Sequence, residues 1–413
     1  MRKLIKSYQR LKEVFTDNPF PEAIFKVFRY FSPSMLKDKY FCLKGIKSKY
    51  FAFSGPFSVQ IDLTDECNNR CLACWCNSPL LGENNKNKDS LAFPLVINLL
   101  EELEYLRTRE IVLSGGGEPF LYPEVLRVLE RIKQKEIICH INTNFALLNK
   151  KIIDELIKLR LDYLTISLWA GSVKTYKIIH PNRNEEDFYR IKENLIFLNS
   201  LKRKLPKVKI YNVIFNLNYF EMEEMLKFAE DVKADYIEYT ILDVIPDKTD
   251  VLLPNREEFK KIKEISQRIL QRKNKIKILN FEHFLRRISQ EEAIKGEYER
   301  NFINSIPCYS GWLFSRILAN GNVIPCLKAH RFPVGNLYKN SFREIWNGEL
   351  MQEFRRKTIN GNRDDNLFYL IGNGDGKDIG CFRICDDLVR NLYFYNRINS
   401  LTYLEGIIFR LIS

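Results

Sequence analysis

Hydrophobic and polar positions follow two different periods along most of the chain. From residue 57 onward, short runs rich in β-branched and aromatic residues alternate with longer segments of helical period. The short runs predict buried strands, and the longer segments predict amphipathic helices. Six strands are expected, at residues 57–64, 109–115, 136–142, 161–168, 207–215 and 234–242.

The segments between the strands are long enough to cross back over a sheet as helices. Helices are expected at residues 94–108, 123–135, 149–160, 185–202 and 218–233, followed by a charged helix at 254–273. This alternation predicts an α/β fold with a parallel sheet, and six such units fit a partial (β/α)6 TIM-like barrel as well as a doubly wound sheet. In both arrangements a functional site is expected at the C-terminal ends of the strands.

The sequence changes character after about residue 300. Alternation gives way to an irregular region, rich in Gly, Asn and Cys, from 308 to 385, where we predict a small C-terminal domain. The end of the chain is apolar and carries Arg397 and Arg410; core packing is the expected use of this tail, ahead of a membrane surface. The predicted parts are a basic helical extension (1–55), a barrel (56–300), the small domain (301–390) and a helical tail (391–413).

The composition agrees with a large folded core. A chain of 413 residues with 45% hydrophobic side chains is long enough for one large domain with an appended one, or for two to three domains. No uncharged apolar run reaches the roughly 20 residues that cross a bilayer, and the N-terminus lacks the apolar core of a secretory signal. We therefore expect a cytoplasmic protein.

The positive charge is concentrated at the N-terminus. Of the net charge of +13, residues 1–50 contribute +8, from twelve Lys and Arg against four Asp and Glu. Such a basic segment with aromatic residues suits contact with anionic lipid, nucleic acid or an acidic protein. Because charge runs are usually solvated faces, we expect an extension packed on the main domain, with peripheral membrane contact as the alternative.

Ten cysteines and only four histidines make sulfur the main source of metal ligands. In a reducing compartment such clustering indicates metal ligation or redox chemistry rather than disulfides. Cys67, Cys71 and Cys74 follow the first predicted strand with the spacing C-x3-C-x2-C. Three thiolates in one loop can wrap a soft metal centre and leave one position open, unlike the four ligands of a structural zinc site.

This spacing resembles the CxxxCxxC motif of radical S-adenosylmethionine (radical SAM) enzymes. Three further segments resemble the family in the expected order: "SGGGEP" at 114–119, "NTNF" at 142–145 and "LTISLWAGSVKTY" at 164–176. Each stands at the C-terminal end of a predicted strand. The resemblance implies a partial barrel in which the three cysteines hold a 4Fe-4S cluster and S-adenosylmethionine (SAM) binds its open iron.

The resemblance also implies which residues bind the cofactor. The glycine-rich loop would support the amino group of SAM, because glycines allow close approach of the backbone, Glu118 can accept a hydrogen bond from an ammonium, and Pro119 fixes the exit. Ser167 would approach the ribose. The full cofactor-binding set is Gly115, Gly116, Gly117, Glu118, Pro119, Asn144 and Ser167.

Several positions depart from the family pattern. Ala73 stands where relatives often carry an aromatic residue near the adenine, and Trp75 lies close enough to substitute. Trp169 replaces an acidic residue found in many relatives, which predicts a more apolar substrate side, and Phe145 replaces the glycine of the TNG segment. Cys76 is expected to be a packed thiol rather than a spare ligand.

Four more cysteines lie in the irregular region: Cys308, Cys326, Cys381 and Cys385. They match the complement of one fully ligated iron-sulfur cluster, with structural zinc as the competing interpretation. The segments "GNVIPC" at 321–326 and "VGNLYKNSFREIWNG" at 334–348 resemble the SPASM or twitch domains of radical SAM enzymes. This resemblance implies a second, auxiliary 4Fe-4S cluster.

The implied activity is reductive cleavage of SAM to a 5'-deoxyadenosyl radical, which abstracts hydrogen from a substrate. The electron would come from a reductase such as flavodoxin or ferredoxin. The substrate is open between a glycan or other small molecule and a peptide, and the net reaction between an oxidation, a cross-link and another modification. The catalytic acid or base is unknown; the candidates are Glu238, Asp243, Asp386 and Asp387.

A different class of protein also fits part of the pattern. A non-catalytic iron-sulfur or zinc protein that binds nucleic acid through its basic N-terminal segment would carry the same cysteines and charge. The ordered motifs at four strand ends favour the enzyme, and we regard nucleic acid as an unlikely partner.

Overall fold

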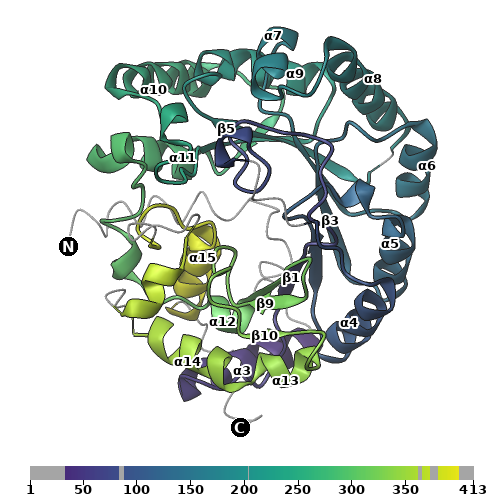
Figure 1. Cartoon of the computed structure of the whole chain (residues 1–413), viewed down its shortest axis with the longest axis vertical. Coiled ribbons are helices and arrows are strands. Elements are labelled where there is room, and N and C mark those ends of the chain that lie inside the picture. The colour runs from purple at the N-terminus through teal and green to yellow at the C-terminus, as the bar shows by residue number, and fades with distance from the viewer. Residues whose placement is uncertain (1–32, 83–87, 203, 361–364, 373–379, 400–413) are drawn as a thin grey trace.

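The computed structural model describes residues 33–82, 88–202, 204–360, 365–372 and 380–399. A curved sheet lies at the centre, and helices form an outer arc around it (Figure 1). The predicted basic segment up to residue 32, much of the polar loop at 82–90 and the tail from residue 400 lie outside the described residues.

All six predicted strands are present, and each pairs in parallel with the next along the chain. This arrangement, with helices on the outside, confirms the α/β class and the partial TIM-like barrel. The strands are β1 (Ser58–Ile61), β2 (Glu110–Leu113), β3 (Ile138–Thr143), β4 (Tyr163–Ser167), β5 (Lys207–Ile214) and β6 (Tyr236–Ile241).

The sheet extends beyond these six strands at both edges. The short β7 (Lys277–Leu279) pairs in parallel with β6. At the other edge, β8 (Phe314–Ile317) pairs in parallel with β1, and β9 (Asn322–Ile324) and β10 (Gly335–Asn336) continue the sheet antiparallel. One sheet therefore runs across the predicted boundary near residue 300, and the division into domains stays a prediction.

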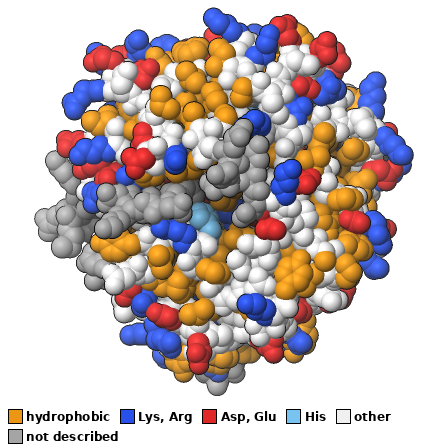
Figure 2. Space-filling view, in the orientation of Figure 1, with side chains coloured by type: hydrophobic (Ala, Val, Ile, Leu, Met, Phe, Trp, Pro, Cys, Tyr) orange, Lys and Arg blue, Asp and Glu red, His pale blue; other side chains and the backbone are white. Residues whose placement is uncertain are grey.

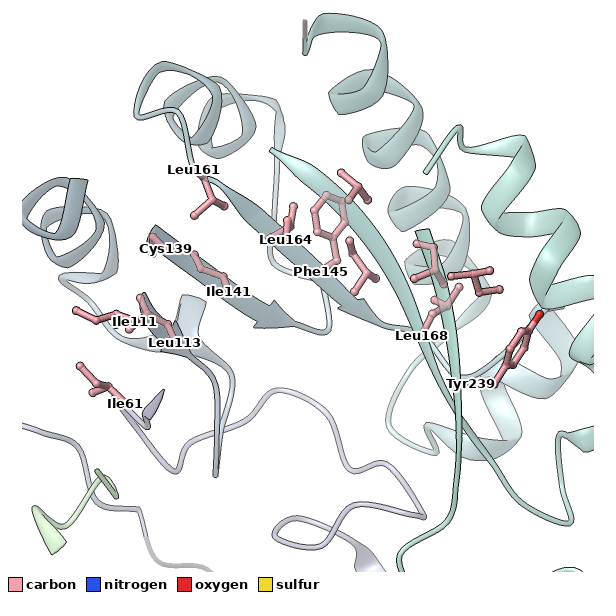
Figure 3. Packing of buried hydrophobic residues seen from close by; sticks show 14 of the residues in the cluster. Ile61, Ile111, Leu113, Cys139, Ile141, Phe145, Leu161, Leu164, Leu168 and Tyr239 are labelled. Atoms are coloured by element: carbon pink, nitrogen blue, oxygen red, sulfur yellow. The ribbon is translucent and has the colours of Figure 1, made fainter. Parts of the chain in front are cut away.

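The two faces of the barrel strands differ in chemistry because side chains alternate between them. On the helix-facing side, apolar residues such as Ile111, Cys139, Ile141 and Leu164 are fully buried (Figure 3). The intervening residues line the barrel interior and are mostly polar: Gln60, Glu110, Ser114, His140, Asn142, Thr165, Ser167, Lys209, Tyr211, Glu238 and Thr240. The core that stabilises the fold thus lies between sheet and helices, which leaves the barrel interior to polar groups.

Six helices of the outer arc match the predicted segments, whereas the helices at Val173–Ile179 and Phe281–Ile288 were not predicted. Four of the eight begin after a residue whose side chain accepts from a free N–H group. Asn184 and Asn255 each form a capping box with an acidic residue three positions later,. The helices of the outer arc are α4 (Phe93–Tyr105), α5 (Val125–Gln134), α6 (Lys150–Lys158), α7 (Val173–Ile179), α8 (Glu185–Leu201), α9 (Met222–Asp231), α10 (Arg256–Gln271) and α11 (Phe281–Ile288).

The remaining helices lie at the open side of the barrel (Figure 1). They are α3 (Pro33–Ser48), α12 (Ser310–Leu313), α13 (Phe342–Trp346), α14 (Glu349–Thr358) and α15 (Leu388–Asn399). The fully buried Arg355 joins this group by donating to the carbonyls of Gly311 and Trp346, both at 2.7 Å. For residues 33–48, packing of the N-terminal extension on the main body is seen in the ion pairs of Asp38 with Arg107 and Arg109. Among the described helices, none has both the length and the apolar character to span a membrane.

A buried ion pair joins the first strand to the C-terminal part of the chain. Arg316 on β8 donates from Nη2 to Oδ2 of Asp62, just after β1, at 2.6 Å, and from Nε to the same oxygen at 3.1 Å. The side chains of Arg316 and Asp62 are only 3% and 1% exposed. Removing one partner would leave an uncompensated charge in the protein interior, which is costly.

We expect Arg316→Ala to lower the free energy of unfolding by about 3–5 kcal/mol, because it leaves the buried Asp62 carboxylate without its cationic partner. Urea unfolding followed by circular dichroism under anaerobic conditions measures this loss. The matched control is Lys158→Ala, which removes an exposed pair with Glu155 and should leave the unfolding midpoint unchanged within error. Equal midpoints for the two variants would contradict the importance of the ion pair.

Candidate functional site

The barrel interior encloses a cavity of about 500 Å³. Its wall contains Cys67, Cys71 and Cys74 together with residues from the ends of β2, β3 and β4. The motifs predicted at the ends of separate strands therefore line one and the same cavity. The predicted residues on this wall are the three cysteines, Gly115, Gly116, Gly117, Glu118, Asn144 and Ser167, whereas Pro119 is buried beside it, at the start of a short turn.

Backbone N–H groups point at the cysteine sulfurs. Sγ of Cys67 accepts from the amide of Asn69 at 3.4 Å, and Sγ of Cys74 accepts from the amides of Cys76 and Asn77 at 3.4 and 3.2 Å. Burial nevertheless raises the pKa of Cys67 to about 12 and also raises the pKa of Cys74. These thiols need a nearby cation to ionise, and iron binding would supply that charge.

The three thiols lie on the wall of one cavity. In a 4Fe-4S cluster each cysteine binds a different iron. Cys67, Cys71 and Cys74 come from one loop and all border the same cavity. The donor set fits a cluster with one open iron.

The glycine-rich loop after β2 packs directly on the cysteine loop. Gly115 has a φ of +125°, and a Cβ atom on it would lie 1.9 Å from Cγ of Asp62. A Cβ on Gly117 would lie 2.1 Å from the carbonyl oxygen of Glu66. The side chain of Asn77 also donates to the Gly116 carbonyl at 2.7 Å. These glycines are thus required for contact between the two loops as well as for any approach of a ligand.

Glu118 links the second and third strand ends. Its carboxylate accepts from Oγ1 of Thr143 at 2.6 Å and from the amide of Asn144 at 2.8 Å. Burial raises the pKa of Glu118 to about 7, and these hydrogen bonds partly oppose the rise. Both carboxylate oxygens already hold the loop after β3 in place, and the predicted contact with the SAM ammonium stays a prediction.

The departures from the family pattern have structural explanations. Phe145, in place of glycine, adopts a φ of +63°, the left-handed conformation that glycine adopts most easily,. Its ring is fully buried, so core packing offsets the backbone strain,. Trp169 has a φ of +62° as well, and its ring lines the cavity.

Cys76 has different surroundings from the three cysteines, whereas Trp75 lies on the same cavity wall. Cys76 is not among the residues on the cavity wall, and its charged neighbours are Asp62, Asp65 and Arg316. This position supports the interpretation of Cys76 as a packed thiol. The Trp75 ring stacks on His330 with centroids 5.2 Å apart, and the guanidinium of Arg316 lies 4.6 Å from the Trp75 ring centroid.

The second cysteine set lines a smaller cavity between β9 and α15. Cys308, Cys326, Cys381 and Cys385 all belong to its wall. Sγ of Cys308 accepts from the side chain of Asn391 at 3.5 Å. Burial raises the pKa of Cys326 and of Cys385, and the neighbouring cysteines and Asp387 raise both further. Four thiols around one enclosed space fit a fully ligated cluster.

The two cavities share a polar wall. Lys328 and Asp386 line both of them, and Lys328 forms an ion pair with Asp243 on the side of the first cavity. Of the predicted acid or base candidates, Glu238, Asp243 and Asp386 lie on the first cavity, whereas Asp387 lies on the second.

Sequence reasoning missed several charged residues of the first cavity: Lys209, Arg287, Arg316 and Lys328. Lys209 alternates with apolar residues within β5, and that alternation was the available signal. Arg287, Arg316 and Lys328 come from other elements, and their position follows only from the fold.

Comparison with known proteins agrees with this geometry. Residues 61–230 match the family model of the radical SAM superfamily, and residues 308–366 match that of SPASM, an iron-sulfur cluster-binding domain. The chain is 22% identical to the tungsten-containing aldehyde ferredoxin oxidoreductase cofactor-modifying protein of Pyrococcus furiosus, over 73% of this chain and 84% of that protein. It is also 22% identical to the subtilosin biosynthesis protein AlbA of Bacillus subtilis, over 73% of this chain and 62% of AlbA.

Solved structures show the same fold. SuiB of Streptococcus suis superimposes with a TM-score of 0.59 at 16% identity, over 80% of this chain and 75% of SuiB. The structure of anSMEcpe with bound AdoMet superimposes with a TM-score of 0.56 at 14% identity, over 86% of this chain and 98% of that chain.

The chain therefore belongs to the radical SAM superfamily. Within the superfamily it is a member with a C-terminal SPASM domain. The family implies a 4Fe-4S cluster with SAM, and the SPASM domain implies auxiliary iron-sulfur clusters, so the predicted cofactors are confirmed at the level of the family.

We expect Glu118→Ala to release the loop after β3, because the Thr143 hydroxyl and the Asn144 amide lose their acceptor. The predicted loss of unfolding free energy is about 1–3 kcal/mol. Hydrogen exchange at Asn144 and Phe145 should accelerate, as measured by mass spectrometry. Glu130→Ala, on the exposed face of α5, is the control. Unchanged exchange at these amides in Glu118→Ala would show that Glu118 does not hold the loop.

Proposed function

We propose that this protein is a radical SAM enzyme that modifies a peptide by abstracting a hydrogen atom. The observation that carries the proposal is that Cys67, Cys71, Cys74, the glycine-rich loop and Ser167 line one cavity. The cluster and SAM, when bound, supply reductive cleavage to a 5'-deoxyadenosyl radical. The chain supplies an enclosed site that holds the reacting groups and excludes water.

Each motif has a defined task in this proposal. Cys67, Cys71 and Cys74 would hold the 4Fe-4S cluster, and the loop after β2 would bind SAM. Ser167, at the end of β4, would contact its ribose. Glu118 keeps the loops after β2 and β3 together, so that both present their backbone to the cofactor at a fixed spacing.

The second cysteine set extends the proposal. Cys308, Cys326, Cys381 and Cys385 would hold one auxiliary 4Fe-4S cluster. Lys328 and Asp386 stand between the two cavities, so this cluster would lie directly behind the wall of the substrate space. When bound, such a cluster would supply an electron acceptor, which a net oxidation or cross-link requires.

The choice of a peptide rests on the relatives. AlbA is named for the biosynthesis of a bacteriocin, and the SuiB and anSMEcpe structures include complexes with peptides. A polar small molecule or glycan is the competing substrate, favoured by the polar barrel interior. Incubation of the reconstituted enzyme with a peptide encoded beside its gene tests this choice, because a cross-link or oxidation lowers the peptide mass by about two hydrogens per turnover.

The nucleic-acid alternative rests on the basic N-terminal segment, most of which lies outside the described residues. On the face shown in Figure 2, Lys and Arg side chains are interspersed with Asp and Glu. Proteins that bind nucleic acid usually present a basic patch or stripe.

We expect Cys71→Ala to abolish formation of 5'-deoxyadenosine, because the cluster loses a ligand, whereas Cys76→Ala should retain it. The assay combines anaerobic reconstitution, dithionite, SAM and chromatography of the products. Loss of activity in both variants would make Cys76 part of the site. If the wild type also forms no 5'-deoxyadenosine, the proposal that the protein is an enzyme is refuted.

We expect Cys385→Ala to lower the iron content from about eight to about four atoms per chain, because only the auxiliary cluster is lost. Cleavage of SAM without peptide should continue, while modification of the peptide should stop. Iron and sulfide analysis with electron paramagnetic resonance measures the clusters. An iron content of about four in the wild type, together with bound zinc, would favour the structural zinc interpretation instead.

A further inference from the structure

Trp169 is held in a conformation that its side chain disfavours. It follows β4, and its φ of +62° lies in the left-handed region. A bulky residue in this region costs on the order of 1–3 kcal/mol, and such strain persists only where the surroundings impose it.

The surroundings of Trp169 do impose this conformation. Its amide donates to Oδ1 of Asn212 at 3.1 Å, and its carbonyl accepts from Nδ2 of Asn218 at 2.8 Å. Asn218 is fully buried and is further fixed by donating to the Val213 carbonyl at 2.8 Å. Two amide side chains on the neighbouring segment thus fix both backbone groups of one residue.

The next residues along the chain are held just as firmly. The carboxylate of Glu221 accepts from the amides of Gly171 and Ser172 at 3.0 and 3.1 Å. The segment after β4 therefore has little freedom, and the Trp169 ring has a fixed place on the cavity wall.

The indole N–H of Trp169 lacks a partner. Within the described part of the chain, Nε1 of Trp169 is buried and makes no hydrogen bond. An unpaired buried donor costs about 1–3 kcal/mol. Phe145 recovers its strain through full burial, whereas Trp169 combines backbone strain with an unpaired donor on the wall of a cavity. Both costs are offset if a ligand accepts this hydrogen bond.

The position of Trp169 points to the kind of ligand. Its ring contacts His180 at 6.2 Å between centroids, and His180 follows directly after Ile179. The carbonyl of Ile179 accepts from the amide of Leu72 at 2.9 Å. Trp169 therefore stands on the side of the cavity next to the cysteine loop, shortly beyond Ser167. A ligand there adjoins the iron site rather than the polar floor of the barrel.

Trp75, the aromatic residue that the sequence suggested for the adenine, already has other contacts. It stacks on His330, and Arg316, which lies over the Trp75 ring, is itself fixed by Asp62. Ala73 lines the cavity without a ring.

We propose that the indole N–H of Trp169 donates a hydrogen bond to an acceptor on the adenosine part of SAM, either a ring nitrogen or a ribose oxygen. The inference rests on the proposed function, since it requires SAM in this cavity. Trp169 is then a cofactor-binding residue of this chain that takes the place of the missing aromatic residue at position 73.

The test is the affinity of the anaerobically reconstituted protein for SAM, measured by equilibrium dialysis without reductant, so that no cleavage occurs. Trp169→Phe keeps an aromatic ring and removes the N–H. We expect its Kd for SAM to rise about 5- to 10-fold, the effect of one net hydrogen bond. The Kd for 5'-deoxyadenosine, which shares only the adenosine part, should rise by the same factor. The control Trp346→Phe also removes an indole N–H, one that donates to the Ser54 carbonyl away from the cavity, and should leave both Kd values within about twofold of the wild type.

Site-specific replacement of Trp169 by benzothienylalanine tests the same contact if Trp169→Phe folds poorly, since sulfur replaces the N–H in a ring of the same shape. An unchanged Kd for SAM in a folded variant with normal iron content overturns the inference. Weaker binding of SAM with unchanged binding of 5'-deoxyadenosine also overturns it, because the contact would then be to the methionine part. A wild type that binds SAM but forms no 5'-deoxyadenosine on reduction refutes the proposed function and leaves the Trp169 contact intact.

Discussion

The ion pair between Asp62 and Arg316 is the constraint on which the site depends. Buried charges are tolerated only in pairs, so the end of β1 and the strand β8 must stay together,. Asp62 also packs against Gly115, and Arg316 lies over Trp75 of the cysteine loop. One interaction between residues far apart in the sequence therefore sets the position of both loops that surround the proposed iron site. The SPASM region is part of that site and not merely an addition to the barrel.

The same continuity fixes the second cysteine-lined cavity relative to the first. The sheet runs without a break from β10 to β7, and a packed sheet transmits position rather than absorbing movement. At the other side, Arg287 donates to the carbonyl of Cys385 at 3.0 Å and pairs with the fully buried Glu299. The polar wall that contains Lys328 is thus held from two directions. Electron transfer between two sites benefits from such a fixed separation, because its rate does not then await a domain movement.

The sequence was informative wherever the signal was local. Short runs of β-branched and aromatic residues located β1 to β6, and the cysteine spacing marked the loop that lines the cavity. β7 was missed because three residues cannot show a period,. The pairing of β8 with β1 and the choice of Asp62 as the partner of Arg316 depend on chain segments about 250 residues apart,. No local pattern contains such a contact. The functional loops could therefore be predicted from the sequence, whereas the ion pair that holds them in place could not.

The left-handed residues after β2, β3 and β4 connect the fold to its chemistry. Gly115, Phe145 and Trp169 each turn the chain at the mouth of the same cavity, with φ values of +125°, +63° and +62°. A glycine makes such a turn at little steric cost, so a larger residue persists there only if its side chain offsets the strain. Phe145 does so inside the core, where it is fully buried. Trp169 is only partly buried against the core, since its ring also borders the cavity and its N–H is unpaired in the described structure. The hydrogen bonds from Asn212 and Asn218 hold the backbone of this turn, and the indole N–H is left for what the cavity binds, as proposed above.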